Sequence, residues 1–165
     1  MKKLTLIALS LVFANSFWSC EKDDLCAEGT PTTPNVVIEF YDATNPENLK
    51  PVTNLGVAAA GFPTGFAFNG VSRITVPLKT NEDQTILRFI QNGSDTDPNN
   101  DNVDVLTFNY TRDDIFVSRA CGYKTVFQLA EDPVLTDDGS LWILSRFVNQ
   151  SNIQNEKETH IKIYF

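Results

Sequence analysis

The sequence is poor in residues that build catalytic sites. His160 is the single histidine among 165 residues, so any Ser–His or Cys–His pair would depend on it. It lies in an alternating segment with Lys162 on the same side, which predicts that its side chain faces solvent. No Cys-x-x-Cys pair is present for zinc or redox chemistry. We therefore expect a protein that is not an enzyme.

Positive charge is also scarce. The chain has 13 Lys and Arg residues against 21 Asp and Glu residues, and its formal net charge is −8. Nucleic acids and anionic lipid surfaces both need a positive footprint on the protein that binds them. The composition therefore disfavours a nucleic-acid partner. It is compatible with cations, neutral glycans or basic proteins.

Long hydrophobic runs are missing too. The longest, from Leu4 to Trp18, is shorter than the ~20 residues that a membrane-spanning helix needs. Lys2 and Lys3 precede it and a small residue, Ser19, follows it. This arrangement is typical of a bacterial lipoprotein signal peptide over residues 1–19. Ordinary secretory cleavage near Ser16 is the alternative.

Three cysteines are present, at positions 20, 26 and 121. An odd thiol is a liability in an oxidising compartment. Acylation of Cys20 removes that liability and leaves an even pair. We therefore predict lipidation at Cys20 and a disulfide between Cys26 and Cys121, as expected for a protein outside the cytoplasm.

A short charged run follows the predicted lipid anchor. Lys22, Asp23 and Asp24 resemble the lysine plus acidic-pair signal that exports Bacteroidota lipoproteins to the outside of the outer membrane. This resemblance implies an outer-membrane protein that faces the cell surface. The alternative is a solvated tether on a protein that faces the periplasm.

The remaining chain predicts one all-β domain. Residues 20–35 are polar, rich in Pro and Thr, and indicate a lipidated tether and linker. Residues 36–165 are enough for a single core. Alternating or apolar segments predict strands over residues 36–41, 55–60, 73–78, 86–91, 105–110, 115–118, 123–129, 141–148 and 160–165. We expect a single antiparallel β-sandwich of immunoglobulin-like or related topology, with a closed barrel as the second choice.

Two turn pairs and one tryptophan refine this expectation. Asn69-Gly70 and Asp138-Gly139 each separate apolar segments and predict tight hairpins, because both tolerate positive φ. Trp142 is the only tryptophan expected after processing. It lies among aliphatic residues, which favours a place in the core over an exposed sugar-stacking role.

Three further segments resemble a known group of proteins. They are Ile38 to Asp42 after a Thr-Thr-Pro linker, Phe108 to Asp113, and Ser118 to Lys124 with its Arg-Ala-Cys-Gly-Tyr core. Together they resemble an uncharacterised family of small flavobacterial-type Bacteroidota lipoproteins of the outer membrane or cell surface. The resemblance spans nearly the whole chain. It implies this architecture and address, and no activity.

An acidic segment from Asn92 to Asp104 suggests a cation site. Oxygen-bearing side chains recur there at near-alternate positions, as in calcium loops: Asp95, Asp97, Asn99, Asp101 and Asp104. The segment lacks the turn glycine and the final glutamate of an EF-hand. The alternatives are a calcium loop and a solvated hairpin loop, whose usual residues are the same. No other cofactor is expected.

Two classes of function fit these features. The first is a surface-anchored, non-catalytic binding or adhesion module, with an envelope protein or a glycan as partner. In one form it is a calcium-stabilised accessory subunit of a glycan-capture or secretion system. The second is a structural envelope lipoprotein without a ligand of its own.

Overall fold

The computed structural model describes residues 25–165. The predictions at Cys20, Lys22, Asp23 and Asp24 lie outside these residues. The described chain divides into two compact units. Residues 25–30 and Phe116–Tyr123 form the smaller one, called here the disulfide unit. Pro31–Ile115 and Lys124–Phe165 form the larger one, called here the body.

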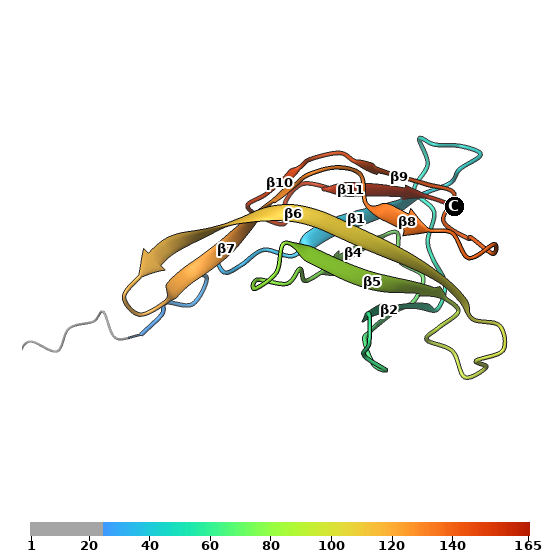
Figure 1. The fold of residues 1–165 in the computed structure, drawn as a ribbon, viewed down its shortest axis with the longest axis horizontal. Helices are drawn as coiled ribbons and strands as arrows, with labels where there is room; N and C mark the ends of the chain where they lie inside the picture. The colour runs from blue at the N-terminus through green and yellow to red at the C-terminus, as the bar shows by residue number, and fades with distance from the viewer. Residues whose placement is uncertain (1–24) are drawn as a thin grey trace, which may run out of the picture. The chain divides into compact units, whose positions relative to one another are not determined.

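Within residues 25–165 the secondary structure consists of strands, without a helix. The strands are β1 (Val36–Tyr41), β2 (Leu55–Ala59), β3 (Phe66–Phe68), β4 (Arg73–Val76), β5 (Gln84–Gln91), β6 (Asn102–Ser118), β7 (Gly122–Leu129), β8 (Val134–Thr136), β9 (Ser145–Val148), β10 (Asn152–Ile153) and β11 (Ile161–Tyr164). They form a four-stranded sheet, β4-β1-β11-β9, and a seven-stranded sheet, β10-β7-β6-β5-β2-β3 with β8 beside β6. Figure 1 shows their arrangement.

The core of the body lies between these two sheets, which confirms the predicted all-β sandwich. Burial alternates along β4, β5 and the first part of β6, as expected for strands with one face on a core, and the buried residues are nearly all apolar. Fully buried members come from both sheets: Ile38, Phe40, Ile161 and Ile163 from one, and Leu55, Phe89, Leu106, Phe108 and Phe127 from the other.

One pair of strands departs from a purely antiparallel arrangement. β1 and β11, the first and last strands, lie side by side and run parallel (Figure 1). Their register pairs Ile38 with Ile161 and Tyr41 with Tyr164. Residues paired in this way point to the same face, so the aliphatic side chains enter the core together and the two tyrosines lie together on the outer face.

The long β6 replaces two predicted strands. The segments at residues 105–110 and 115–118 were expected to be separate, but both belong to one strand of 17 residues. Its first part pairs with β5 from Asn102 to Asn109, and the burial alternates there. From Thr111 to Phe116 the residues are exposed. The loss of alternation marks the end of the core, not the end of the strand.

Both predicted tight hairpins are wrong. Gly70 and Gly139 do have positive φ values of 64° and 85°, as the sequence indicated. However, β3 pairs with β2 and β4 pairs with β1, while β8 pairs with β6 and β9 pairs with β11. Each turn therefore carries the chain from the seven-stranded sheet to the four-stranded sheet.

The end of the predicted linker is part of the body. Pro34 is buried. The backbone N–H and the side-chain amide of Asn35 both donate to Glu156 Oε1, at 2.9 and 2.8 Å. The Thr33 hydroxyl accepts a hydrogen bond from the Thr125 N–H at 2.9 Å. Ordered contacts of the body thus begin before β1.

Candidate functional site

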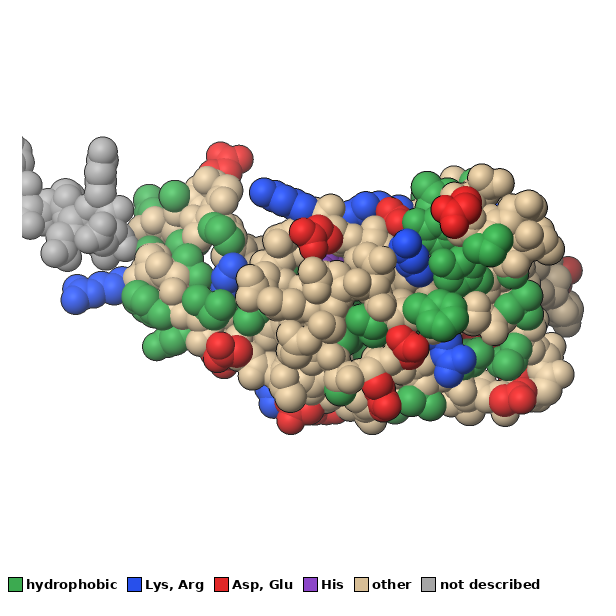
Figure 2. All heavy atoms as spheres, turned by 90° about the horizontal axis from the view of Figure 1, so that it is seen from above, with side chains coloured by type: hydrophobic (Ala, Val, Ile, Leu, Met, Phe, Trp, Pro, Cys, Tyr) green, Lys and Arg blue, Asp and Glu red, His purple; other side chains and the backbone are tan. Residues whose placement is uncertain are grey.

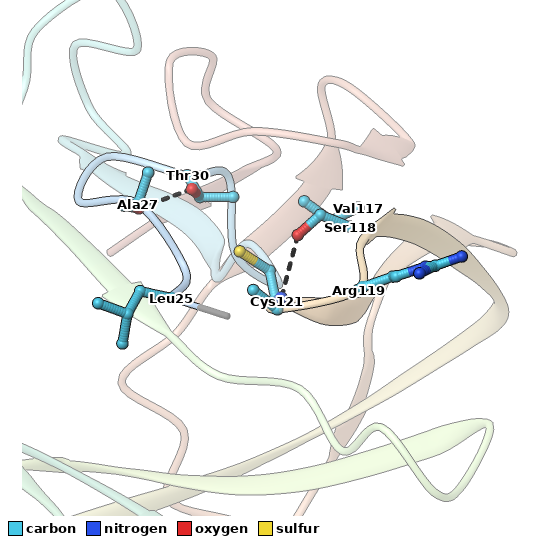
Figure 3. Close-up of a pocket in the computed structure, with 8 residues that line it drawn as sticks. Leu25, Ala27, Thr30, Val117, Ser118, Arg119 and Cys121 are labelled. Carbon is cyan, nitrogen blue, oxygen red and sulfur yellow. Dashed lines mark hydrogen bonds between the residues drawn. The ribbon is translucent and has the colours of Figure 1, made fainter. Parts of the chain in front are cut away.

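The disulfide unit contains the predicted bridge. Cys26 and Cys121 are bonded, 95 residues apart in sequence, which confirms the pairing expected from the cysteine count. Two hydrogen bonds shape the segments around the bridge, from the Thr30 hydroxyl to the Ala27 carbonyl at 2.6 Å and from the Cys121 N–H to the Ser118 hydroxyl at 3.0 Å (Figure 3).

A hollow of about 570 Å³ lies in this unit. Val117, Ala120 and Cys121 are among the residues that line it, and Arg119 points away from the bridge (Figure 3). Leu25, also in the lining, is 85% exposed. None of the described residues of the unit is buried, so the lining of the hollow is partly or fully exposed to solvent.

The acidic loop joins β5 to β6, and its side chains form hydrogen bonds with other residues of the same loop. Asp95 Oδ1 accepts the Asp97 N–H at 2.8 Å. Asp97 Oδ1 accepts the backbone and side-chain N–H groups of Asn99, at 3.1 and 2.8 Å. The side-chain bond from Asn99 is the main cause that lowers the pKa of Asp97. These are the bonds of a polar turn, which the hairpin-loop alternative also predicts.

Asp104, the last of the predicted calcium ligands, lies in β6 and not in the loop. It is fully buried within β6, and its Oδ2 accepts the N–H groups of Trp142 at 3.1 Å and Ile143 at 2.7 Å. Burial, the largest cause, raises its pKa. Among the described residues no three His, Cys, Asp or Glu side chains gather as a metal site would require. The five predicted calcium ligands are therefore not brought together.

Trp142 belongs to the core, as predicted. Its indole N–H donates to the Phe89 carbonyl at 3.1 Å. Its ring lies 6.4 Å from that of Phe40 and 5.6 Å from that of Phe165, measured between centroids. With its polar atom paired and its faces packed, this tryptophan is not available to stack on a sugar.

His160 corrects the prediction of a solvent-facing imidazole. It is 1% exposed, and its Nδ1 accepts the Val37 N–H at 2.9 Å. The backbone N–H of His160 donates to the Val37 carbonyl at 3.0 Å. Burial lowers its pKa. The position just before β11 faces β1 and not solvent, so His160 is a neutral structural residue that links the two strands.

A surface group of three aromatic side chains, one exposed and two half-buried, was not predicted from the sequence. Tyr41, Phe147 and Tyr164 lie together on the outer face of the four-stranded sheet and are called here the aromatic patch. The two tyrosine rings stack at 5.4 Å, and Phe147 meets Tyr164 edge-on at 5.9 Å. Phe147 is 51% exposed. The signal was available, since both tyrosines occupy the polar side of alternating strands.

Polar groups of both signs border the aromatic patch. The Tyr41 hydroxyl donates to Glu39 Oε2 at 2.8 Å, and Arg73 pairs with the other oxygen of Glu39 at 3.1 Å. Burial, followed by Glu39, raises the pKa of Tyr41 to about 12. The Lys162 ammonium lies 5.3 Å from the centre of the Tyr41 ring. The patch thus offers both hydrogen-bond donors and acceptors beside apolar rings.

A notch of about 280 Å³ adjoins the aromatic patch. Phe147 and Tyr164 form one wall, and Ala43, Pro46 and Ser145 complete it. The residues after β1 therefore contribute to it, together with β9 and β11. Figure 2 shows hydrophobic side chains gathered toward one end of the body, among acidic and basic ones.

A comparison with protein-family models gives one match, to a family of unknown function (DUF6452), over residues 60–165. The chain belongs to this family. The match covers β3 to β11 and so includes Cys121, Phe147 and Tyr164, while Cys26 and Tyr41 precede it. Curated proteins and solved structures give no match. Within the described residues no helix is long and apolar enough to cross a membrane.

Proposed function

We propose that this protein is a lipid-anchored module of the bacterial outer membrane, displayed at the cell surface, that binds a glycan without catalysis. The aromatic patch is the observation that carries the binding role. Most large apolar side chains of the body are buried in the core, yet three aromatic rings remain together on the outer face of one sheet. Grouped exposed apolar side chains typically mark a binding surface.

The chemistry of the aromatic patch suits an uncharged glycan. Aromatic rings contact the apolar C–H faces of sugars, and Tyr adds a polar edge. Glu39 supplies acceptors and Lys162 supplies donors beside the rings, which matches the hydroxyl groups of a sugar. The notch next to Phe147 and Tyr164 gives one sugar ring a place to enter. The net charge of −8 opposes polyanions and leaves neutral chains unaffected.

Binding is tested with the double variant Phe147→Ala/Tyr164→Ala. Each lost ring contact costs about 1 kcal/mol, so glycan affinity should fall at least tenfold. Full-length protein, immobilised through its anchor, is probed with an array of neutral bacterial and host glycans. Phe62→Ala, which removes another exposed ring of the body, is the matched control. Unchanged binding by the double variant, or no binding by the wild type, would contradict the proposal.

The anchor is tested separately from the ligand. Cys20→Ala should leave the protein uncleaved or soluble, because two or more acyl chains at ~0.8 kcal/mol per buried methylene supply the attachment. Replacing Lys22, Asp23 and Asp24 by Ala should reduce display without affecting folding. Proteolysis of intact cells measures display. Complete protection of the wild type would place the protein at the periplasmic face.

A further inference from the structure

One side of the sandwich core is open to solvent. A groove of about 400 Å³ lies there, between β2, β3 and β5 of one sheet and the chain that leaves β4 of the other. Its inner wall includes Val57, Val76 and Leu87, which are core residues exposed by no more than 5%. The groove is therefore a place where the interior of the body reaches the surface.

Two phenylalanines form the rim of this groove. Phe62 and Phe66 line it and are 61% and 51% exposed. Such exposure is costly for large apolar rings unless something covers them. A ligand that enters the groove would bury these rings and extend the core at once.

The rim is held in place before any ligand binds. Arg88 donates to the Phe62 carbonyl at 2.6 Å, and the Phe62 N–H donates to the Ala59 carbonyl at 3.1 Å. Gly65 lies so close to β2 that an added Cβ would meet the Val57 carbonyl oxygen at 2.1 Å. The groove is thus preformed, which lowers the entropic cost of binding.

The backbone of Lys79 and the hydroxyl of Thr85, both in the groove wall, are already hydrogen-bonded. The Lys79 N–H donates to the Thr85 hydroxyl at 2.9 Å, the two hydroxyls of Thr85 and Tyr110 lie 2.6 Å apart, and the Tyr110 hydroxyl donates to the Lys79 carbonyl at 2.9 Å. These three hydrogen bonds join Lys79, Thr85 and Tyr110 to one another. The polar groups of this part of the wall therefore need no partner from a ligand, whose apolar part contacts the apolar side chains.

The only charged side chain in the groove lining is cationic. It belongs to Lys79, whose ammonium is partly exposed and pairs with Glu82 at 2.9 Å. An exposed pair of this kind is weak, so the ammonium can turn to another anion. A positive group beside an apolar groove fits a ligand with an anionic head and an apolar tail, because the ammonium can pair with the head while the tail contacts the wall.

We propose that this groove binds a single acyl chain with a carboxylate head, the tail lying between the sheets and the head at Lys79. The site is distinct from the aromatic patch and does not depend on glycan binding. Since each buried methylene adds about 0.8 kcal/mol, affinity should rise about fourfold per carbon until the groove is filled.

The probe is 11-(dansylamino)undecanoic acid, added to the full chain kept soluble in an amphipol. We expect blue-shifted emission that dodecanoate displaces. Ala59→Phe should fill the groove and weaken binding at least tenfold. Leu144→Ala, which changes an exposed apolar side chain outside the groove lining, is the matched control and should bind normally. Some probe partitions into the amphipol itself. The emission from this fraction is the same for the wild type and both variants, and it is subtracted.

The head-group assignment has its own measurement. Dodecyltrimethylammonium should displace the probe at least fivefold less well than dodecanoate, and Lys79→Gln, an exposed change that leaves the core intact, should abolish that preference.

Equal emission from Ala59→Phe with unchanged circular dichroism would overturn the acyl site. Equal displacement by the cationic and anionic chains would overturn the role of Lys79. If Ala59→Phe does not fold, the chain-length series from hexanoate to dodecanoate decides, because a flat series contradicts a groove for the tail.

Discussion

The disulfide unit and the body differ in what stabilises them, a covalent bond in the first and a buried apolar core in the second. In the disulfide unit every described residue is at least partly exposed, and Leu25, Phe116 and Tyr123 are 85%, 56% and 69% exposed. The body buries a continuous apolar core between two sheets. A region without a core needs a covalent constraint, and the Cys26–Cys121 bond supplies one.

The body is stabilised by two buried polar side chains, which have no counterpart among the described residues of the disulfide unit. Asp104 accepts two backbone N–H groups from residues 142 and 143, and His160 accepts one from Val37. Each satisfies backbone donors at a place where a sheet hydrogen bond is missing. The disulfide unit is thus held by a covalent bond, whereas the body also relies on hydrogen bonds that form between buried groups.

Removal of the disulfide should have the largest effect. A bridge between residues 95 apart restricts the unfolded chain, and its loss is expected to cost about 4 kcal/mol. Urea unfolding of Cys26→Ser/Cys121→Ser against the wild type measures this free energy. The wild type under reducing conditions is the control and should match the variant. An unchanged midpoint would mean that the bridge constrains only its own unit.

Loss of the buried carboxylate should come next. Asp104→Ala leaves the N–H groups of Trp142 and Ile143 buried without an acceptor, at a cost of about 3 kcal/mol. Asp104→Asn keeps an acceptor oxygen and is the matched control, expected to lose less than half as much. Thermal unfolding followed by Trp142 fluorescence reports on the site directly. Equal losses in the two variants would show that the charge, and not the acceptor, is required.

Local patterns predicted the sandwich well because its core residues obey a simple alternation. Val36, Ile38 and Phe40 enter the core and Glu39 and Tyr41 do not, as the sequence indicated. Val37, expected on the outer side with them, is buried as well. Pairing between strands was harder, because nothing local to Gly70 or Gly139 shows that the chain changes sheets there. The parallel contact of β1 with β11 joins the two ends of the body and has no local signal either.

Polar residues were the least predictable. Asp104 follows a run of exposed Asp and Asn side chains, yet it is the first buried residue of β6, so spacing alone grouped it with the loop. His160 shows a similar failure, since its burial depends on Val37, 123 positions away. The aromatic patch combines strands β1, β9 and β11, and only the fold brings Tyr41 to Tyr164.

The smallest expected effect is the pH dependence that His160 gives to the body. Burial, its main influence, lowers the pKa of the imidazole; among the nearby charges, Arg73 lowers it further, while Glu158 and Glu156 oppose the shift. The folded state therefore holds a neutral His160 at a pH where the unfolded chain, with a pKa near 6.5, already binds a proton. The free energy of unfolding should thus decrease as pH falls below about 6.5, and should be unaffected by this group above that value.

The variant His160→Asn isolates this contribution, because an amide oxygen can still accept the Val37 N–H but does not titrate. One titrating group changes stability by at most about 1.4 kcal/mol per pH unit. The difference between wild type and variant should therefore shrink by less than that amount per unit as pH falls from 6.5 to 5, with a constant difference from pH 7 to 8. Urea unfolding at each pH supplies the curve, and the pairwise difference removes the carboxylates common to both proteins. A difference that stays constant across the whole range would mean that His160 keeps its ordinary pKa in the folded body, and that its burial beside β1 excludes less water than the packing indicates.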